Sequence, residues 1–147
     1  QKLGFSQVVN IKETDLEELV MSFTAGRGAD VFIEGTGVAE GLEQCLSCMR
    51  NFGRVVLLGN PQAGMELSQQ AYWQILRKEL TLTGTWNSSF SLAGNDDWQA
   101  AMSSMADGSI DVEALITQVF PLSAYQEAFT LMRDKKELYC KVMFVND

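Results

Sequence analysis

Three stretches of the chain combine a short apolar run with glycine at or near its end. They are Ala29–Gly37, Arg54–Pro61 and Leu80–Trp86. A continuous apolar run is typical of a strand that is covered on both faces of its sheet, whereas a half-exposed strand alternates. Segments of helical length lie between the runs, and this order predicts an α/β fold with a parallel sheet.

The intervening segments have apolar residues at three- and four-residue spacing, which predicts amphipathic helices. Thr14 or Asp15 is the expected cap of the first helix, and Ser123 of the last. The helices are expected over residues 15–23, 39–49, 69–78, 96–105 and 124–135, and further strands over Gln7–Asn10, Leu115–Phe120 and Tyr139–Val145.

Ligands of parallel sheets bind beyond the carboxyl ends of the strands. Gly35 and Gly37 follow the first apolar run, and two interpretations stay open. They form a tight turn into the next helix, or they let the backbone come close to a ligand. Glu34 lies in the same apolar strand and needs a partner there. We expect its carboxylate to contact solvent or a backbone amide, not to be catalytic.

Composition narrows the function classes. The chain has 147 residues, about one domain, and 46% of them are hydrophobic, which is enough for a core. The net charge is −8 without any run of lysine or arginine, which argues against nucleic acid or an anionic membrane surface as partner. No apolar run approaches the ~20 residues of a membrane span.

The chain contains no histidine, which excludes histidine general bases and most catalytic zinc sites built from this chain alone. The three cysteines show no disulfide spacing, so a reducing, cytoplasmic setting is expected. Cys45 and Cys48 form a Cys-x-x-Cys pair in the middle of a predicted helix. Buried packing is therefore favoured over a redox or zinc role.

The order of motifs resembles the medium-chain dehydrogenase/reductase superfamily over essentially the whole chain. The landmarks are Gly28–Gly37, Gly53–Gly59, Leu80–Trp86, Leu115–Leu122 and the helix-turn-strand of Ala124–Val145. Within the superfamily, the chain is most similar to the zinc-dependent polyol branch, with sorbitol and galactitol-1-phosphate dehydrogenases as the nearest types.

This resemblance implies a set of cofactor-binding positions after the three strands. Thr36 would face the adenosine side of the dinucleotide. The end of the second strand would contact the nicotinamide ribose and carboxamide, mostly through backbone groups. The end of the third strand would close over the nicotinamide, although Trp86 is equally suited to a core or an interface. The positions are Gly35, Thr36, Gly37, Leu58, Gly59, Asn60, Thr85, Trp86 and Asn87.

The resemblance also implies parts that this sequence lacks. Family members carry a domain with the zinc ligands, a Gly-x-Gly-x-x-Gly turn and a ribose-binding acid. We therefore expect a C-terminal part: residues 1–87 as a partial Rossmann domain missing its first strands, and residues 88–147 as an α/β extension that returns to the catalytic domain. No catalytic residue or metal ligand is expected here. The first strand would lose its neighbour, so we expect its edge to be covered by a second copy, by Gln7–Asn10 or by other residues.

The implied activity is NAD(P)-dependent oxidation of a secondary alcohol in a polyol or sugar phosphate. Zinc would polarise the hydroxyl and nicotinamide would accept hydride. The chain alone is expected to be inactive and to form a homodimer through Leu80–Trp86. The alternative is a non-catalytic dimerisation module that uses this same strand. The final segment argues against a methyltransferase. The substrate and the choice of NAD or NADP stay open.

Overall fold

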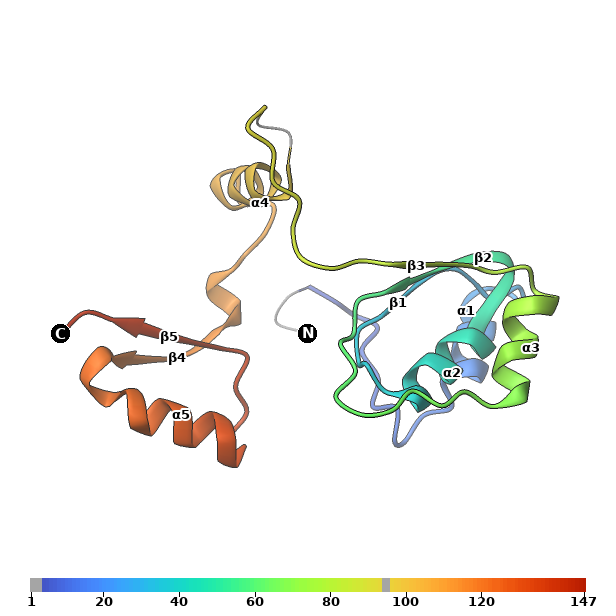
Figure 1. The fold of residues 1–147 in the computed structure, drawn as a ribbon, viewed down its shortest axis with the longest axis horizontal. Helices are drawn as coiled ribbons and strands as arrows, with labels where there is room; N and C mark the ends of the chain where they lie inside the picture. Colours follow the sequence, from blue (N-terminus) through green and yellow to red (C-terminus); the bar gives the residue numbers. More distant parts are fainter. Residues whose placement is uncertain (1–3, 94–95) are drawn as a thin grey trace. The chain divides into compact units, whose positions relative to one another are not determined.

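The computed structural model describes residues 4–93 and 96–147 (Figure 1). The chain divides into two compact units, and each is described by itself. One unit is Val9–Asn87, and the other contains the described residues of Ser88–Asp147 together with Gly4–Val8.

The first unit is built on a three-stranded sheet of β1 (Ala29–Glu34), β2 (Met49–Leu57) and β3 (Thr81–Gly84) in the order β1-β2-β3. Both pairings are parallel, and Val55 of β2 lies beside Phe32 of β1 and Leu82 of β3. The parallel α/β sheet predicted from the three apolar runs is therefore confirmed.

Three helices cover one face of this sheet (Figure 1): α1 (Leu16–Phe23), α2 (Ala39–Cys48) and α3 (Gln69–Arg77). The Asp15 carboxylate accepts from the Glu18 amide at 3.0 Å, and the Ser68 hydroxyl accepts from the Ala71 amide at 3.1 Å. These contacts satisfy first-turn amides that have no partner within the helix. The core between helices and sheet consists of Leu42, Cys45, Leu46, Met49, Val55 and Ala71.

The opposite face of the sheet is open in this unit. Because side chains alternate along a strand, Val31 and Ile33 point away from the side that carries Phe32. They are 46% and 62% exposed. Doubly wound sheets have helices on both faces, so this unit is the partial Rossmann arrangement that the sequence predicts.

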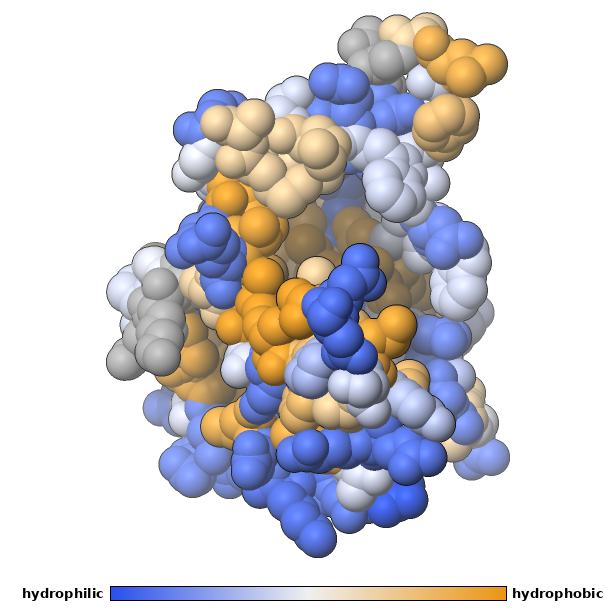
Figure 2. Space-filling view, turned by 90° about the vertical axis from the view of Figure 1, so that its left-hand side faces the viewer, coloured by the Kyte–Doolittle hydropathy of each residue, from blue (hydrophilic) through white to orange (hydrophobic). Residues whose placement is uncertain are grey.

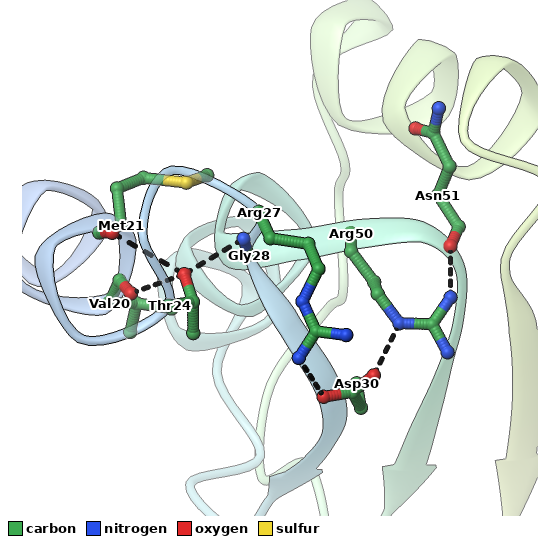
Figure 3. Close-up of polar contacts among 8 residues, drawn as sticks. All are labelled: Val20, Met21, Thr24, Arg27, Gly28, Asp30, Arg50 and Asn51. Carbon is green, nitrogen blue, oxygen red and sulfur yellow. Dashed lines mark hydrogen bonds and ion pairs between the residues drawn. The ribbon is translucent and has the colours of Figure 1, made fainter.

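A group of polar contacts joins the beginning of β1 to α1 and β2 (Figure 3). The Thr24 hydroxyl donates to the Val20 carbonyl and accepts from the Gly28 amide, at 2.7 and 2.9 Å. Asp30 pairs with Arg50 at 2.5 Å and with Arg27 at 3.0 Å. The hydrogen bond from Arg50 is the main reason why the pKa of Asp30 lies below its usual range.

The second unit contains α4 (Asp97–Ala106) and a strand-helix-strand motif made of β4 (Ile116–Pro121), α5 (Tyr125–Asp134) and β5 (Lys141–Val145). The two strands are parallel. Ala128 of α5 is fully buried, and the rings of Phe129 and Phe144 lie 6.1 Å apart. Short 3-10 turns, Glu113–Leu115 and Leu122–Ala124, precede β4 and α5.

Large apolar side chains stay exposed in this unit. Leu122, Phe129 and Met143 are 55%, 59% and 47% exposed. The space-filling view shows apolar side chains gathered on the face that it draws (Figure 2). The amphipathic helix predicted over residues 96–105 forms as α4, but its apolar side is exposed as well, since Trp98 is 61% and Met102 is 60% exposed. Within the described chain, that side does not pack inward.

Three local predictions are also wrong. Gln7–Asn10 is not a strand, so it does not cover the edge of β1, and no other strand of the described residues pairs there. β2 begins at Met49, before the predicted run Arg54–Pro61, and Phe52 within it has a positive φ of 59° while its amide donates to the Lys78 carbonyl at 2.7 Å. Ser123 does not cap α5, since its hydroxyl donates to Asp147 at 3.1 Å.

Within residues 4–93 and 96–147, none of the helices is both long enough and apolar enough to cross a membrane.

Candidate nucleotide-binding site

The carboxyl ends of the three strands are tied to one another by backbone hydrogen bonds. The amides of Leu58 and Gly59 both donate to the Glu34 carbonyl, at 2.8 and 2.9 Å. The Thr85 amide donates to the Leu57 carbonyl at 3.0 Å. The segments predicted to bind cofactor thus leave the sheet side by side at one end, where ligands of parallel sheets bind.

The turns after β1 and β2 are packed too closely for side chains. A Cβ on Gly59 would lie 2.2 Å from the Gly37 nitrogen. A Cβ on Gly37 would lie 2.8 Å from the carbonyl carbon and oxygen of Asn60, and Gly37 has a φ of +67°. Glycine is therefore required at both positions by the contact between the turns. The tight-turn interpretation of Gly37 is confirmed, and close approach to a ligand stays a prediction.

Glu34 is the buried acid at this junction, with only 4% of its surface exposed. Its Oε1 accepts from the Thr36 amide at 2.6 Å, from the Gly37 amide at 3.0 Å and from the Thr36 hydroxyl. Burial raises the pKa of Glu34, but these hydrogen bonds outweigh it and hold the pKa below its usual range. The predicted contact with a backbone amide is confirmed.

Gly41 is a part of the site that the sequence prediction missed. A Cβ there would lie 2.2 Å from the Thr36 hydroxyl oxygen and 3.4 Å from the Glu34 Oε1. Its position in the first turns of α2 lets the helix approach the Glu34–Thr36 pair. The signal in the sequence is a glycine within a helical pattern, which commonly has a packing reason.

A cavity of about 650 Å³ adjoins these turns. Three of the predicted residues line it, namely Thr36, Gly37 and Asn60, while Gly35, Leu58 and Gly59 do not. The rest of the lining comes from the start of α2 and the loop after β2: Val38, Ala39, Glu40, Gln62, Ala63, Gly64 and Glu66.

The chemistry of this lining disfavours phosphate. It includes two carboxylates, from Glu40 and Glu66, and no lysine or arginine. The amides of Thr36 and Gly37, which could otherwise bind an anion, already donate to Glu34. The cavity is therefore suited to uncharged hydroxyl or amide groups of a ligand.

The third predicted segment lies at the same end of the sheet but outside this cavity lining. Thr85, Trp86 and Asn87 are all exposed, and Trp86 retains 70% of its surface. Trp86 is therefore not a core residue of its unit. Asn87 has a positive φ of 47°, so the chain turns sharply directly after the strand.

The two cysteines of the Cys-x-x-Cys pair have a structural role. Cys45 and Cys48 have no exposed surface, and burial raises the pKa of Cys45 to about 12 and also raises that of Cys48. Neither thiol is a reactive nucleophile, as the helical pattern predicts. Among the described residues, no group of three or more Cys, Asp or Glu side chains could hold a metal ion.

Sequence comparison places these features in a family. Residues 1–107 match the family model described as zinc-binding dehydrogenase. The chain is 32% identical over 139 residues to an erythritol/L-threitol dehydrogenase of Mycolicibacterium smegmatis, covering 93% of the chain and 36% of that protein. It is 31% identical over 140 residues to an L-threonine 3-dehydrogenase of Pyrococcus furiosus, covering 92% and 38%.

Solved structures share the fold. Galactitol-1-phosphate dehydrogenase of Escherichia coli matches with a TM-score of 0.81 at 23% identity, over 95% of this chain and 40% of that one. An alcohol dehydrogenase of Thermotoga maritima matches with a TM-score of 0.78 at 26% identity, over 98% and 38%. The chain thus spans less than half the length of these relatives. Its fold is that of the C-terminal Rossmann-like part of these dehydrogenases, and the chain belongs to the zinc-binding dehydrogenase family.

Proposed function

We propose that this chain forms one wall of the NAD(P) site in a zinc-dependent dehydrogenase that oxidises a secondary alcohol of a polyol or sugar phosphate. The observation that carries the proposal is the pair of interlocked glycine turns beyond β1 and β2, next to a cavity of about 650 Å³. Parallel α/β sheets bind dinucleotides at this location.

The proposed contacts are those predicted after the three strands. Gly35, Thr36 and Gly37 border the adenosine side, while Leu58, Gly59 and Asn60 meet the nicotinamide ribose and carboxamide. Thr85, Trp86 and Asn87 close over the nicotinamide. The cavity is lined by the uncharged residues Thr36, Gly37 and Asn60 and by two carboxylates, which supports hydroxyl and amide contacts more than phosphate contacts.

The chemistry itself would require the rest of the enzyme. Bound nicotinamide accepts hydride, and zinc acts on the substrate hydroxyl. The residues described here offer no set of zinc ligands. The two parts of the chain fit this assignment, with 1–87 as cofactor wall and 88–147 as the segment that returns to the catalytic domain. We therefore propose that the chain alone is inactive.

The substrate class is supported by the relatives. One is named for erythritol and L-threitol, which are polyols, and several are named for L-threonine, which carries a hydroxyl group. The match to galactitol-1-phosphate dehydrogenase concerns the fold.

An NADH titration of the 15N-labelled chain, followed by amide spectra, tests the cofactor wall. We expect shift changes at the amides after β1, β2 and β3. The opposite end of the sheet, represented by Arg27 and Asn51, is an internal control and should not respond. Spectra that stay unchanged at millimolar NADH, or that change equally at both ends, would contradict the proposal.

A dimerisation module is the second candidate function. β3 lies at the edge of its sheet, and the side chains of Leu80–Trp86 are mostly exposed. We propose a homodimer through this strand in either case. A silent NADH titration in calorimetry, combined with a stable dimer in sedimentation, would favour the module over the cofactor wall.

We also propose a cytoplasmic location. Cys45, Cys48 and Cys140 are free thiols, and Cys140 is exposed. Exposed free thiols are typical of a reducing compartment. Fluorescence microscopy of the tagged protein in its own cell would test this.

A further inference from the structure

Glu34 holds both turns of the candidate site at once. Its backbone carbonyl accepts from Leu58 and Gly59, which begin the segment after β2. Its carboxylate accepts from the Thr36 amide, the Gly37 amide and the Thr36 hydroxyl, which form the turn after β1. A single residue therefore joins these two segments through its backbone and its side chain.

The carboxylate has little freedom to leave this position. One oxygen lies 2.8 Å from the site where a Cβ on Gly59 would stand, and the other lies 3.4 Å from the corresponding site on Gly41. The backbone of both neighbours thus approaches the carboxylate where any other residue would place a side chain. With 4% of its surface exposed, Glu34 has almost no contact with solvent.

We infer that Glu34 is the positioning residue of the cofactor wall, which acts through Thr36 and Gly37 without itself touching the cofactor. The inference rests on the proposed function of this site. By accepting from three donors of the turn, Glu34 directs their protons inward and fixes the side of the turn that faces the cavity. It thereby determines which groups the wall offers to a nucleotide.

The chemistry favours a carboxylate over a neutral amide at this position. A carboxylate only accepts and has about four lone-pair sites, whereas glutamine would bring two N–H donors to the site of one oxygen. That oxygen lies 2.8 Å from the position of a Cβ on Gly59, and Glu34 is only 4% exposed. Glu34→Gln would therefore bring N–H donors into a site that holds only an acceptor in the wild type.

The test compares Glu34→Gln with Glu43→Gln. Glu43 is a matched control, because its carboxylate also accepts from a backbone amide, that of Ser68 at 2.6 Å, but does not line the cavity. We expect Glu34→Gln to weaken NADH binding about tenfold, the loss that corresponds to one hydrogen bond to a charged group. We expect Glu43→Gln to leave NADH affinity unchanged.

Amide proton shifts supply a readout that is independent of the cofactor. In the labelled chain, the amides of Thr36 and Gly37 should lose their downfield shift in Glu34→Gln and keep it in Glu43→Gln. Thr36→Ser retains the hydroxyl donor to Glu34 and is the reference variant. Thr36→Val removes the hydroxyl at conserved size and should bind NADH more weakly than Thr36→Ser.

The outcomes separate this inference from the proposed function. If the wild-type chain binds no NADH, the proposed cofactor wall is overturned, and so is the role of Glu34 towards a cofactor. The amide shifts then still decide whether Glu34 orders the turn. If the wild type binds and a folded Glu34→Gln binds equally well, the inference is overturned alone. If Glu34→Gln does not fold, Thr36→Val decides, and affinity equal to Thr36→Ser overturns the inference.

Discussion

A single methyl group is enough to separate the two turns that border the cavity. Gly59 and Gly37 have no space for a Cβ, because backbone atoms occupy it. Gly35 lies in the same turn, yet no atom comes within 4 Å of its Cβ position, and its φ is not in the left-handed region. Neighbouring glycine positions of one motif therefore differ in whether they have space for a side chain.

Gly59→Ala should destabilise the chain by about 1–3 kcal/mol, the usual effect of overpacking. The added carbon would meet the Gly37 nitrogen at 2.2 Å, so backbone must move to admit it. Urea unfolding followed by circular dichroism measures the change. Gly35→Ala is the matched control and should stay within about 0.5 kcal/mol of the wild type. Equal losses in both variants would contradict the packing argument.

Glu34 should make stability depend on pH in a defined direction. Its folded pKa lies below the ordinary value of 4.5, so its ionised form stabilises the fold above that value. The stabilisation should decrease as the pH falls below 4.5 and through the folded pKa. We expect the wild type to exceed Glu34→Gln by about 1–3 kcal/mol at neutral pH.

Urea unfolding of both proteins from pH 7 to pH 3 measures this difference. Other carboxylates are common to the two chains and cancel. A difference that grows as the solution becomes more acidic would contradict the assignment.

At the scale of elements, the helices were predictable because their apolar spacing, and in three of them a capping side chain, lies in the local sequence. Asp15, Ser68 and Asp96 each accept from an amide three residues further along. The strand predicted at Gln7–Asn10 failed because a strand requires a partner, and Val8 is 61% exposed. The beginning of β2 was missed because its Asn-x-Gly sequence resembles a turn, and the hydrogen bond from the Phe52 amide to the Lys78 carbonyl depends on a residue far along the chain.

The same distinction between local signals and distant contacts explains which parts of the candidate site could be predicted. The segments after the three strands could be predicted, since chain order and parallel topology determine which strand ends meet. The role of Glu34 could not, because it depends on a turn that folds back onto the side chain two residues earlier. An acid in an apolar strand was the only signal. Whether the nine predicted residues bind a cofactor remains a prediction.

The end of α2 depends on a side chain from beyond α3. Lys78 Nζ donates to the carbonyls of Leu46 and Ser47, at 3.1 and 2.8 Å. These are among the last carbonyls of the helix, which lack partners within it. Lys78 thereby joins α2 to the segment that leads into β3.

Lys78→Met keeps most of the side-chain stem and removes the charged donor. We expect a loss of about 1–2 kcal/mol, which combines lost hydrogen bonds with the lost charge at a helix C-terminus. Lys136→Met is the control, because its ion pair with Asp134 is 3.6 Å long and its side chain is 81% exposed. It should change stability by less than about 0.5 kcal/mol. Thermal unfolding of both variants measures these changes. Equal decreases in the melting temperature of the two variants would contradict the role of Lys78.

At the scale of the whole molecule, the open surfaces suit a chain that spans about 36–40% of its relatives. Among the described residues of the first unit, one face of the sheet has no helices, and Ile33 is 62% exposed there. The edges at β1 and β3 are free of other strands among the described residues. The edge at β3 carries the proposed dimer contact.

Gly84→Pro should weaken the proposed dimer. The Thr85 amide points to β2, so alternation along the strand directs the Gly84 amide to the free edge, where proline removes the donor. Sedimentation should show a shift from dimer to monomer. Gly84→Ala is the control, since its Cβ would meet no atom within 4 Å, and should stay dimeric. If Gly84→Pro stays dimeric too, the interface lies elsewhere.

The contact between Gly37 and Gly59 also has a consequence for recombination. Because each turn occupies the space in which the other would need a side chain, the two loops form a matched pair although 22 positions separate them. A chimera with a relative whose crossover falls between these positions would combine loops that were never fitted to each other. Chimeras that fold should therefore take both loops, and the segment between them, from the same parent sequence.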